Sequence, residues 1–106
     1  MFRERRSFML KKALLAKLEA KPGKEKEVEA LLCKGLEIVQ AEEPDTVTWY
    51  ALKLGPSTYG IFDTFEGEDG RQAHLNGKVA AALMEQAPNL LAKSPQIDKV
   101  DIIAAK

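Results

Sequence analysis

Two side chains of this 106-residue chain combine reactive chemistry with a position that suggests a functional site. His74 is the only histidine and falls in a helical run, where a histidine is usually structural or exposed and less often a proton-transfer group. Asp63 falls inside an apolar strand, on the same face as Ile61 and Phe65, where an isolated carboxylate is costly. Asp63 therefore needs a donor such as an arginine, a tryptophan Nε1 or a tyrosine hydroxyl. It is a candidate base, although a structural ion pair is the more typical role.

Most of the aromatic side chains gather in one stretch, residues 46–65. Five of the seven rings of the chain lie there: Trp49, Tyr50, Tyr59, Phe62 and Phe65. Packing in a core or between subunits is the more typical role for such a group, and a pocket for a flat aromatic ligand is the alternative. The two roles do not exclude each other.

Other familiar chemistries find no support in the sequence. It contains no nucleophile elbow, phosphate-binding loop or dinucleotide-binding glycine motif, and its one histidine and one cysteine offer neither a zinc site nor an intrachain disulfide. The acidic residues Glu66, Glu68 and Asp69 match no calcium loop and predict a solvated loop followed by the first turn of a helix. Cys33 falls in an apolar helical pattern and is expected to be a small buried side chain.

The composition is that of an ordinary globular domain, with 45% hydrophobic and 30% charged residues. Sixteen basic residues balance sixteen acidic ones, so the chain has no net field to attract nucleic acid or an anionic membrane. No stretch has the length of a membrane span or the pattern of a signal peptide. We expect one domain, without nucleic-acid or membrane partners, in a reducing cytoplasm.

The hydrophobic periodicity predicts a basic arm over residues 1–8 and a single domain over residues 9–106. A period of two over residues 9–20 favours a strand, with a helix as the alternative by propensity. Residues 24–41 carry a helical apolar stripe, and β-branched residues over 97–105 predict a last strand. The stripe consists of Val28, Leu31, Leu32, Gly35, Leu36 and Val39.

Residues 46–65 predict a β-hairpin around Gly55-Pro56-Ser57. A second helical region follows, with a break at Gly77, a second helix over residues 78–87 and an end at Pro88. The inward residues expected in this region are Ala73, Leu75, Val79, Leu83 and Met84.

The resulting order β, α, β, β, α, β is that of a ferredoxin-like α+β domain, in which a four-stranded antiparallel sheet carries both helices on one face. In the predicted hairpin Tyr50 lies opposite Phe62 and Trp49 opposite Asp63, so both faces carry bulky side chains. Helices cover only one face. We expect a second copy of the chain to cover the other, because so large an apolar patch is unusual on a monomer.

The run from Thr58 to Phe65, TYGIFDTF, followed by the acidic loop and Ala73-His74-Leu75, resembles the antibiotic biosynthesis monooxygenase domain family. The likeness extends over residues 9–106. It implies a dimeric α+β barrel, in which two ferredoxin-like subunits pack sheet on sheet and each holds a pocket between sheet and helices. It also implies oxygenation of quinol or polycyclic aromatic substrates by O₂ without flavin or metal, because an electron-rich phenolate itself passes an electron to oxygen.

The resemblance also suggests roles for individual residues. His74 would face the pocket and help to deprotonate a phenol, with Trp49 and Asp63 as the other two catalytic candidates. The candidates for substrate contacts are Tyr59, Tyr50, Phe62 and Arg71.

The leading hypothesis is a cytoplasmic homodimeric monooxygenase that needs no cofactor and oxidises a small quinol or phenol. The first alternative is a ligand-binding or stress-associated dimer of the same fold without turnover. A haem-degrading branch of the same superfamily uses a histidine on the second helix and an asparagine on the first strand. The predicted first strand has no asparagine, so haem degradation is the less favoured alternative.

Overall fold

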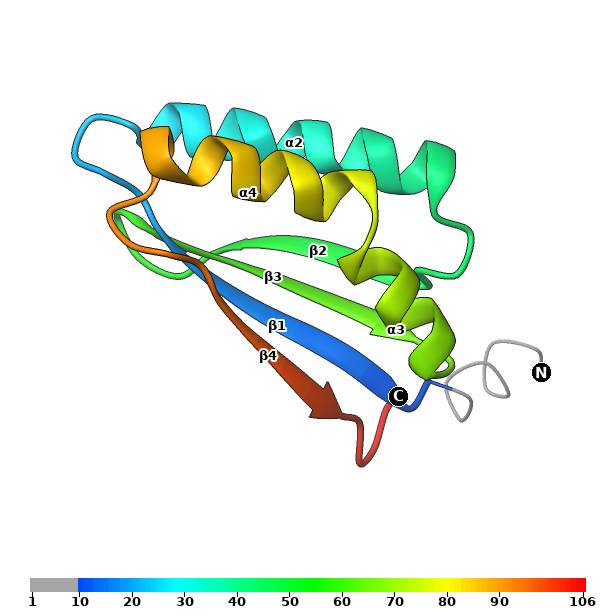
Figure 1. The fold of residues 1–106 in the computed structure, drawn as a ribbon. Helices are drawn as coiled ribbons and strands as arrows, with labels where there is room; N and C mark the ends of the chain where they lie inside the picture. Colours follow the sequence, from blue (N-terminus) through cyan, green and yellow to red (C-terminus); the bar gives the residue numbers. More distant parts are fainter. Residues whose placement is uncertain (1–9) are drawn as a thin grey trace.

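The computed structural model describes residues 10–106 and has the predicted order of elements (Figure 1). The elements are β1 (Lys12–Glu19), α2 (Glu25–Glu42), β2 (Thr48–Lys53), β3 (Thr58–Phe65), α3 (Glu68–Leu75), α4 (Lys78–Leu90) and β4 (Gln96–Asp101). The first segment is a strand rather than a helix, and Gly77 separates α3 from α4 as predicted. The predicted arm, residues 1–8, lies outside the described residues.

Within residues 10–106 the four strands form one sheet in the order β2-β3-β1-β4, and every neighbouring pair is antiparallel. This topology confirms the predicted ferredoxin-like α+β class. The hairpin register is also as predicted, with Trp49 paired to Asp63 and Tyr50 to Phe62. Because side chains alternate along β3, Asp63 points into the buried face and Phe62 toward the opposite face.

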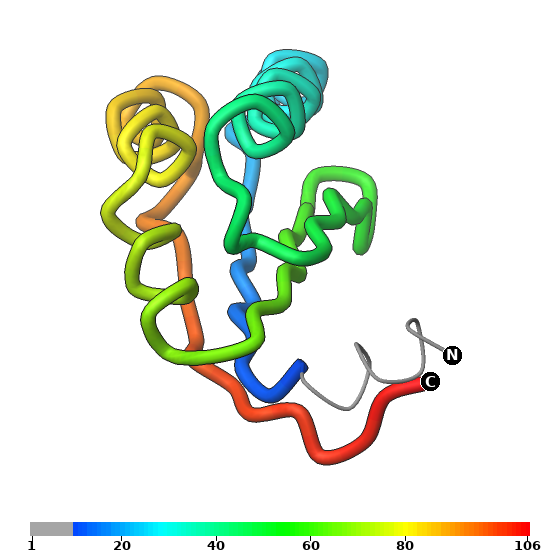
Figure 2. Tube along the Cα trace, turned by 90° about the vertical axis from the view of Figure 1, so that its right-hand side faces the viewer, coloured from blue at the N-terminus to red at the C-terminus, as the bar shows by residue number. Residues whose placement is uncertain are grey.

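The helices all lie on the same side of the sheet. Figures 1 and 2 show α2 and α4 side by side above the strands, with α3 at the end of the sheet where β3 finishes. The main core fills the space under α2 and α4 and consists of Ala16, Leu18, Ala20, Val28, Leu32, Tyr59, Ile61, Leu83, Ala87, Leu90 and Leu91. No helix of the described residues covers the other face of the sheet, and none is long and apolar enough to cross a membrane.

The end of α4 differs from the prediction, because the helix continues through Pro88 to Leu90. The proline removes one backbone donor, which would otherwise bond to the carbonyl of Met84 one turn earlier in the helix. Burial of Ala87 and Leu90 offsets this loss, and the Leu90 carbonyl accepts a hydrogen bond of 2.8 Å from the Lys21 backbone amide. Tertiary contacts thus extend the helix past the residue that was expected to end it.

Some side chains expected to face inward are exposed. Leu36 and Met84 lie at the edges of their helical stripes, with 39% and 55% of their surface accessible, and Cys33 is exposed rather than buried. Ala73 is exposed as well. The last strand is shorter than predicted and ends at Asp101, although its β-branched composition continues to Ile103.

We expect the core between sheet and helices to account for most of the stability. Replacing Leu18, which is 1% exposed, with alanine should lower the free energy of unfolding by about 2–5 kcal/mol in urea denaturation, because a cavity forms under α2 and α4. The same change at the fully exposed Ile103 should alter it by less than about 0.5 kcal/mol. Equal effects of the two changes would contradict this assignment of the core.

Candidate functional site

A buried histidine lies between two carboxylates where α2, β3 and α3 meet. His74 of α3 has its Nε2 atom 2.8 Å from Asp63 Oδ2, and its Nδ1 atom 2.5 Å from Oε1 of Glu43, the residue that follows α2. The side chains of His74, Asp63 and Glu43 are 8%, 1% and 11% exposed. We call these three residues the acid–imidazole–acid array.

Local structure explains why these side chains meet. Asp63 faces the helices because β3 alternates, and Phe65 on the same face packs its ring against the imidazole with centroids 5.6 Å apart. Arg71, one turn before His74, fixes α3 to the sheet by donating from Nη1 to the carbonyls of Ala13 and Val100 at 3.2 and 3.1 Å. The buried face of α3 is therefore anchored where its histidine reaches β3.

The array requires a protonated imidazole. A neutral imidazole has one N–H and can donate to only one carboxylate, whereas the imidazolium donates to both. Burial lowers the pKa of His74, but the hydrogen bonds and negative charges of Asp63 and Glu43 outweigh it and raise the pKa above its ordinary value. One cation and two carboxylates give the array a formal charge of minus one.

The two carboxylates differ in how completely they are bound. Glu43 Oε1 also accepts a hydrogen bond from Thr46 Oγ1 at 2.9 Å, so it has two partners. Glu43 Oε2 and Asp63 Oδ1 are buried and have no hydrogen-bond partner within residues 10–106. Such atoms are rare in native proteins and often mark sites that bind something further.

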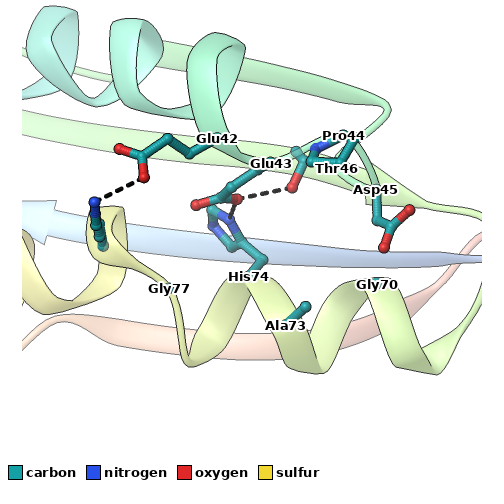
Figure 3. Close-up of a pocket in the computed structure, with 10 residues that line it drawn as sticks. Glu42, Glu43, Pro44, Asp45, Thr46, Gly70, Ala73, His74 and Gly77 are labelled. Atoms are coloured by element: carbon teal, nitrogen blue, oxygen red, sulfur yellow. Dashed lines mark hydrogen bonds and ion pairs between the residues drawn. The ribbon is translucent and has the colours of Figure 1, made fainter.

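A cavity of about 360 Å³ opens beside the array (Figure 3). It lies between the α2–β2 connection and the α3–α4 junction, and its lining residues are Glu42, Glu43, Pro44, Asp45, Thr46, Gly70, Ala73, His74, Gly77 and Lys78. Lys78 Nζ is paired with Glu42 Oε1 at 2.7 Å across one side of it. Glu43 and His74 are the members of the array that line this cavity.

The array does not resemble a metal or haem site. Among residues 10–106 there is no group of three or more histidine, cysteine, aspartate or glutamate side chains that could hold a metal ion. Each nitrogen of His74 faces its own carboxylate, so neither presents a lone pair to iron. This geometry favours proton handling over ligation.

The structure brings His74 and Asp63 together, whereas Trp49 lines two other hollows, one of which is also lined by Glu43 and Tyr50. The Trp49 ring packs beneath α2, where a Cβ at Gly35 would lie 3.3 Å from it, and it lines a narrow apolar slot with Ile61 and Val79. It does not line the cavity beside the array. Its Nε1 has no hydrogen-bond partner within residues 10–106, so it is not the donor that Asp63 requires.

The predicted substrate-contact residues also lie outside this cavity. Tyr59 is buried in the core and donates its hydroxyl to Glu29 Oε2 at 2.6 Å, a hydrogen bond that, together with burial, raises the pKa of Tyr59 to about 12. Tyr50 and Phe62 face the other side of the sheet. Every N–H-bearing atom of the Arg71 guanidinium has a protein acceptor, since Nε and Nη2 bind the Glu68 carboxylate.

The sequence analysis did not identify Glu43 and Thr46. Glu43 lies just beyond the predicted helix of residues 24–41 and was given no role. A signal was nevertheless present, because acidic side chains are unfavourable at the carboxyl end of a helix dipole and α2 has no basic residue in its last turn. A carboxylate in that position has a local cost that a specific partner, here His74, offsets.

Solved structures share this fold. A candidate antibiotic biosynthesis monooxygenase from Caulobacter crescentus superposes with a TM-score of 0.75 at 21% identity, covering 97% of this chain and 99% of that chain. Another from Nitrosomonas europaea gives a TM-score of 0.77 at 10% identity, covering 88% and 90%. The chain therefore has the ferredoxin-like fold of antibiotic biosynthesis monooxygenases, as its sequence suggested.

A nearer relative identifies the family itself. The NE2512 protein of unknown function from Nitrosomonas europaea is 52% identical, with a TM-score of 0.89 over 92% of this chain and 94% of that chain. The chain belongs to the same family as that protein. No protein-family profile matches the sequence, and no curated protein sequence matches it.

We expect His74 to titrate above about pH 6.5, the value of an unperturbed histidine, in an NMR titration of its ring protons. Asp63→Asn should lower this pKa, because one of the two charges that stabilise the imidazolium is lost, whereas Glu29→Gln in the separate Tyr59 contact should leave it unchanged.

The raised pKa of His74 also makes the stability of the fold depend on pH, because the folded-state pKa lies above the unfolded value. The array's contribution to stability is therefore complete below about pH 6.5 and is lost as the pH rises through the folded-state pKa. A His74 pKa at or below 6.5 in the folded protein would contradict the array.

Proposed function

We propose that this protein is a monooxygenase that needs no cofactor and oxidises a small quinol or phenol with O₂. The observation that supports the proposal is the acid–imidazole–acid array, because two of its buried side chains, Glu43 and His74, line a cavity of about 360 Å³. A cavity of this size suits one small ring. The fold shared with candidate antibiotic biosynthesis monooxygenases supports the same chemistry.

The proposed reaction balances without an external reductant. A quinol hydroxyl loses a proton to the protein and an electron to O₂, which gives a semiquinone and superoxide. These combine at a ring carbon, the proton returns, and the resulting hydroperoxide loses water. One oxygen atom thus enters the ring as a hydroxyquinone and the other leaves as water. The protein supplies binding and a place for the proton.

We also propose that the protein acts as a homodimer through the open face of the sheet. Tyr50 and Leu54 project from this face with 54% and 50% of their surface accessible, beside Phe62. Apolar side chains on a sheet face are typical of surfaces that a second subunit covers.

We propose that the protein works in the cytoplasm. Cys33 is an exposed free thiol, and such a thiol fits a reducing compartment.

A binding module without turnover is the second candidate. It is favoured by the fact that both nitrogens of His74 are already bound, which leaves no imidazole lone pair to attack a substrate proton directly. In such a protein the array would serve to recognise a ligand hydroxyl. Saturable binding of a phenol without oxygen consumption would distinguish this function from the enzyme.

Oxygen uptake tests the proposed reaction. With flavin and metal removed, the protein should consume O₂ with at least one member of a panel of hydroquinones, and His74→Ala should lower kcat by about 100-fold, because the array that supports proton transfer is lost. Gln72→Ala, an exposed change on the same helix, should leave the rate unaltered. A flat oxygen trace across the whole panel would reject the enzyme.

Light scattering tests the dimer. The wild-type protein should have twice the mass of the 11.7 kDa chain at micromolar concentration. Tyr50→Glu should yield monomers, because it buries a charge in the subunit interface. Met84→Glu, at a residue that is similarly exposed but lies on α4, should remain dimeric. A stable wild-type monomer would exclude the sheet-to-sheet assembly.

A further inference from the structure

The two oxygens of the Glu43 carboxylate have different surroundings. Oε1 is bound by His74 and Thr46, whereas Oε2 is buried and without a hydrogen-bond partner in the described part of the chain. We propose that Glu43 is the residue that accepts the proton of the substrate hydroxyl, on its Oε2 atom, and that His74 and Asp63 are positioning residues behind it. The substrate in this inference rests on the proposed function, but the hydrogen bond to a phenol can be tested without turnover.

Position distinguishes Glu43 from the other members of the array. Asp63 Oδ1 also lacks a partner, but Asp63 is 1% exposed and does not line the cavity. His74 lines the cavity, yet both of its nitrogens point at carboxylates. Figure 3 shows one Glu43 oxygen joined to His74 and Thr46 and the other directed away from both. Glu43 alone in the array combines a place in the cavity wall with a buried oxygen that has no hydrogen-bond partner in the described part of the chain.

Gly77 lies directly against this oxygen. A Cβ placed at Gly77 would lie 3.0 Å from Glu43 Oε2 and 3.2 Å from the Ala73 carbonyl, closer than side chains normally approach. A residue larger than glycine would press on the carboxylate at the α3–α4 junction. The junction covers Oε2 in the unliganded protein, so a ligand hydroxyl reaches it as the Gly77 backbone moves aside, and it then supplies a hydrogen bond that solvent does not.

The step is chemically reasonable only if proton and electron leave together. A carboxylate is a weaker base than a phenolate by about six pKa units, so Glu43 cannot ionise a resting phenol to a useful extent. A phenol that has given an electron to O₂ becomes a strong acid. The O–H bond then breaks, the proton passes to Oε2 and superoxide keeps the electron. Glu43 returns this proton to the peroxide that forms when the radical and superoxide combine.

His74 and Asp63 prepare Glu43 for this step. The imidazolium holds Oε1 at 2.5 Å and orients the carboxylate, so Oε2 retains a fixed direction. Asp63 fixes the other side of the ring at 2.8 Å and balances its charge. A positioning role predicts that changes at His74 alter how Glu43 interacts with a phenol, and not only how tightly the protein folds.

The direct test uses para-nitrophenol, an electron-poor phenol whose neutral and ionised forms absorb at different wavelengths. Bound to the wild-type protein, its apparent pKa should rise by about one unit relative to free solution, because an ionised Glu43 favours the neutral hydroxyl. Glu43→Gln should abolish this rise and, with an active quinol, lower kcat by about 100-fold. Glu37→Gln, an exposed neutralisation on the same helix, should change neither quantity.

His74→Gln tests the positioning role with the same probe. The apparent pKa of bound para-nitrophenol should return toward its value in solution, because Glu43 then lacks the cation that orients its carboxylate. A histidine that is merely structural would change the affinity and leave this pKa where it was. Exposed Gln72→Ala serves as the control on α3.

Two glycines provide a test that leaves every charge in place, in case Glu43→Gln does not fold. Gly77→Ala should weaken para-nitrophenol binding about tenfold, because its Cβ displaces the carboxylate, whereas Gly67→Ala has no atom within 4 Å of its Cβ and should bind normally. The inference is overturned if para-nitrophenol does not bind, if it binds with its solution pKa, or if Glu43→Gln keeps the wild-type pKa rise. Absence of oxygen uptake in a protein that shows the rise would reject the monooxygenase and retain the Glu43 hydrogen bond.

Discussion

The imidazolium between Glu43 and Asp63 is the interaction on which this end of the molecule depends. Removing two carboxylates from water is costly, and a buried cation that donates to both of them offsets the cost only if its position is fixed. The fold provides that position in three ways. The alternation of β3 directs Asp63 inward, the carbonyls of β1 and β4 hold Arg71, and the end of α2 delivers Glu43. The array therefore joins all the layers of the domain at one point.

Two glycines make this meeting sterically possible. A Cβ at Gly70 would lie 3.1 Å from the Asp45 carbonyl, and a Cβ at Gly77 would lie 3.0 Å from Glu43 Oε2. Both residues lie where α3 and its junction with α4 approach the α2–β2 connection. The sequence alone predicts a break between two helices at Gly77 and gives no sign of this steric role for either glycine. In the structure they allow the α2–β2 connection to approach close enough for a carboxylate to reach His74.

Patterns that repeat along the chain were sufficient to predict the layers, the strand order and the hairpin register, because burial on a sheet or helix face enforces a period. Side-chain contacts between elements that are far apart in the sequence were harder to predict. Asp63 was expected to need a donor, but the donor is His74 rather than an arginine, tyrosine or tryptophan, since nothing in the local pattern gives the distance between β3 and α3. Glu43 was missed for the same reason. The aromatic residues clustered in sequence lie on both faces of the sheet, so most of them pack and do not line the cavity.

The central claim is that a phenolic ligand binds at the cavity beside the array with its hydroxyl on Glu43. A crystal structure of the protein with bound para-nitrophenol tests it most directly. The claim predicts a ligand oxygen within hydrogen-bonding distance of Glu43 Oε2, with His74 still between the two carboxylates. A ligand seated instead in the apolar slot beside Trp49, or an imidazole that has left Asp63 to bind the phenol itself, would contradict it.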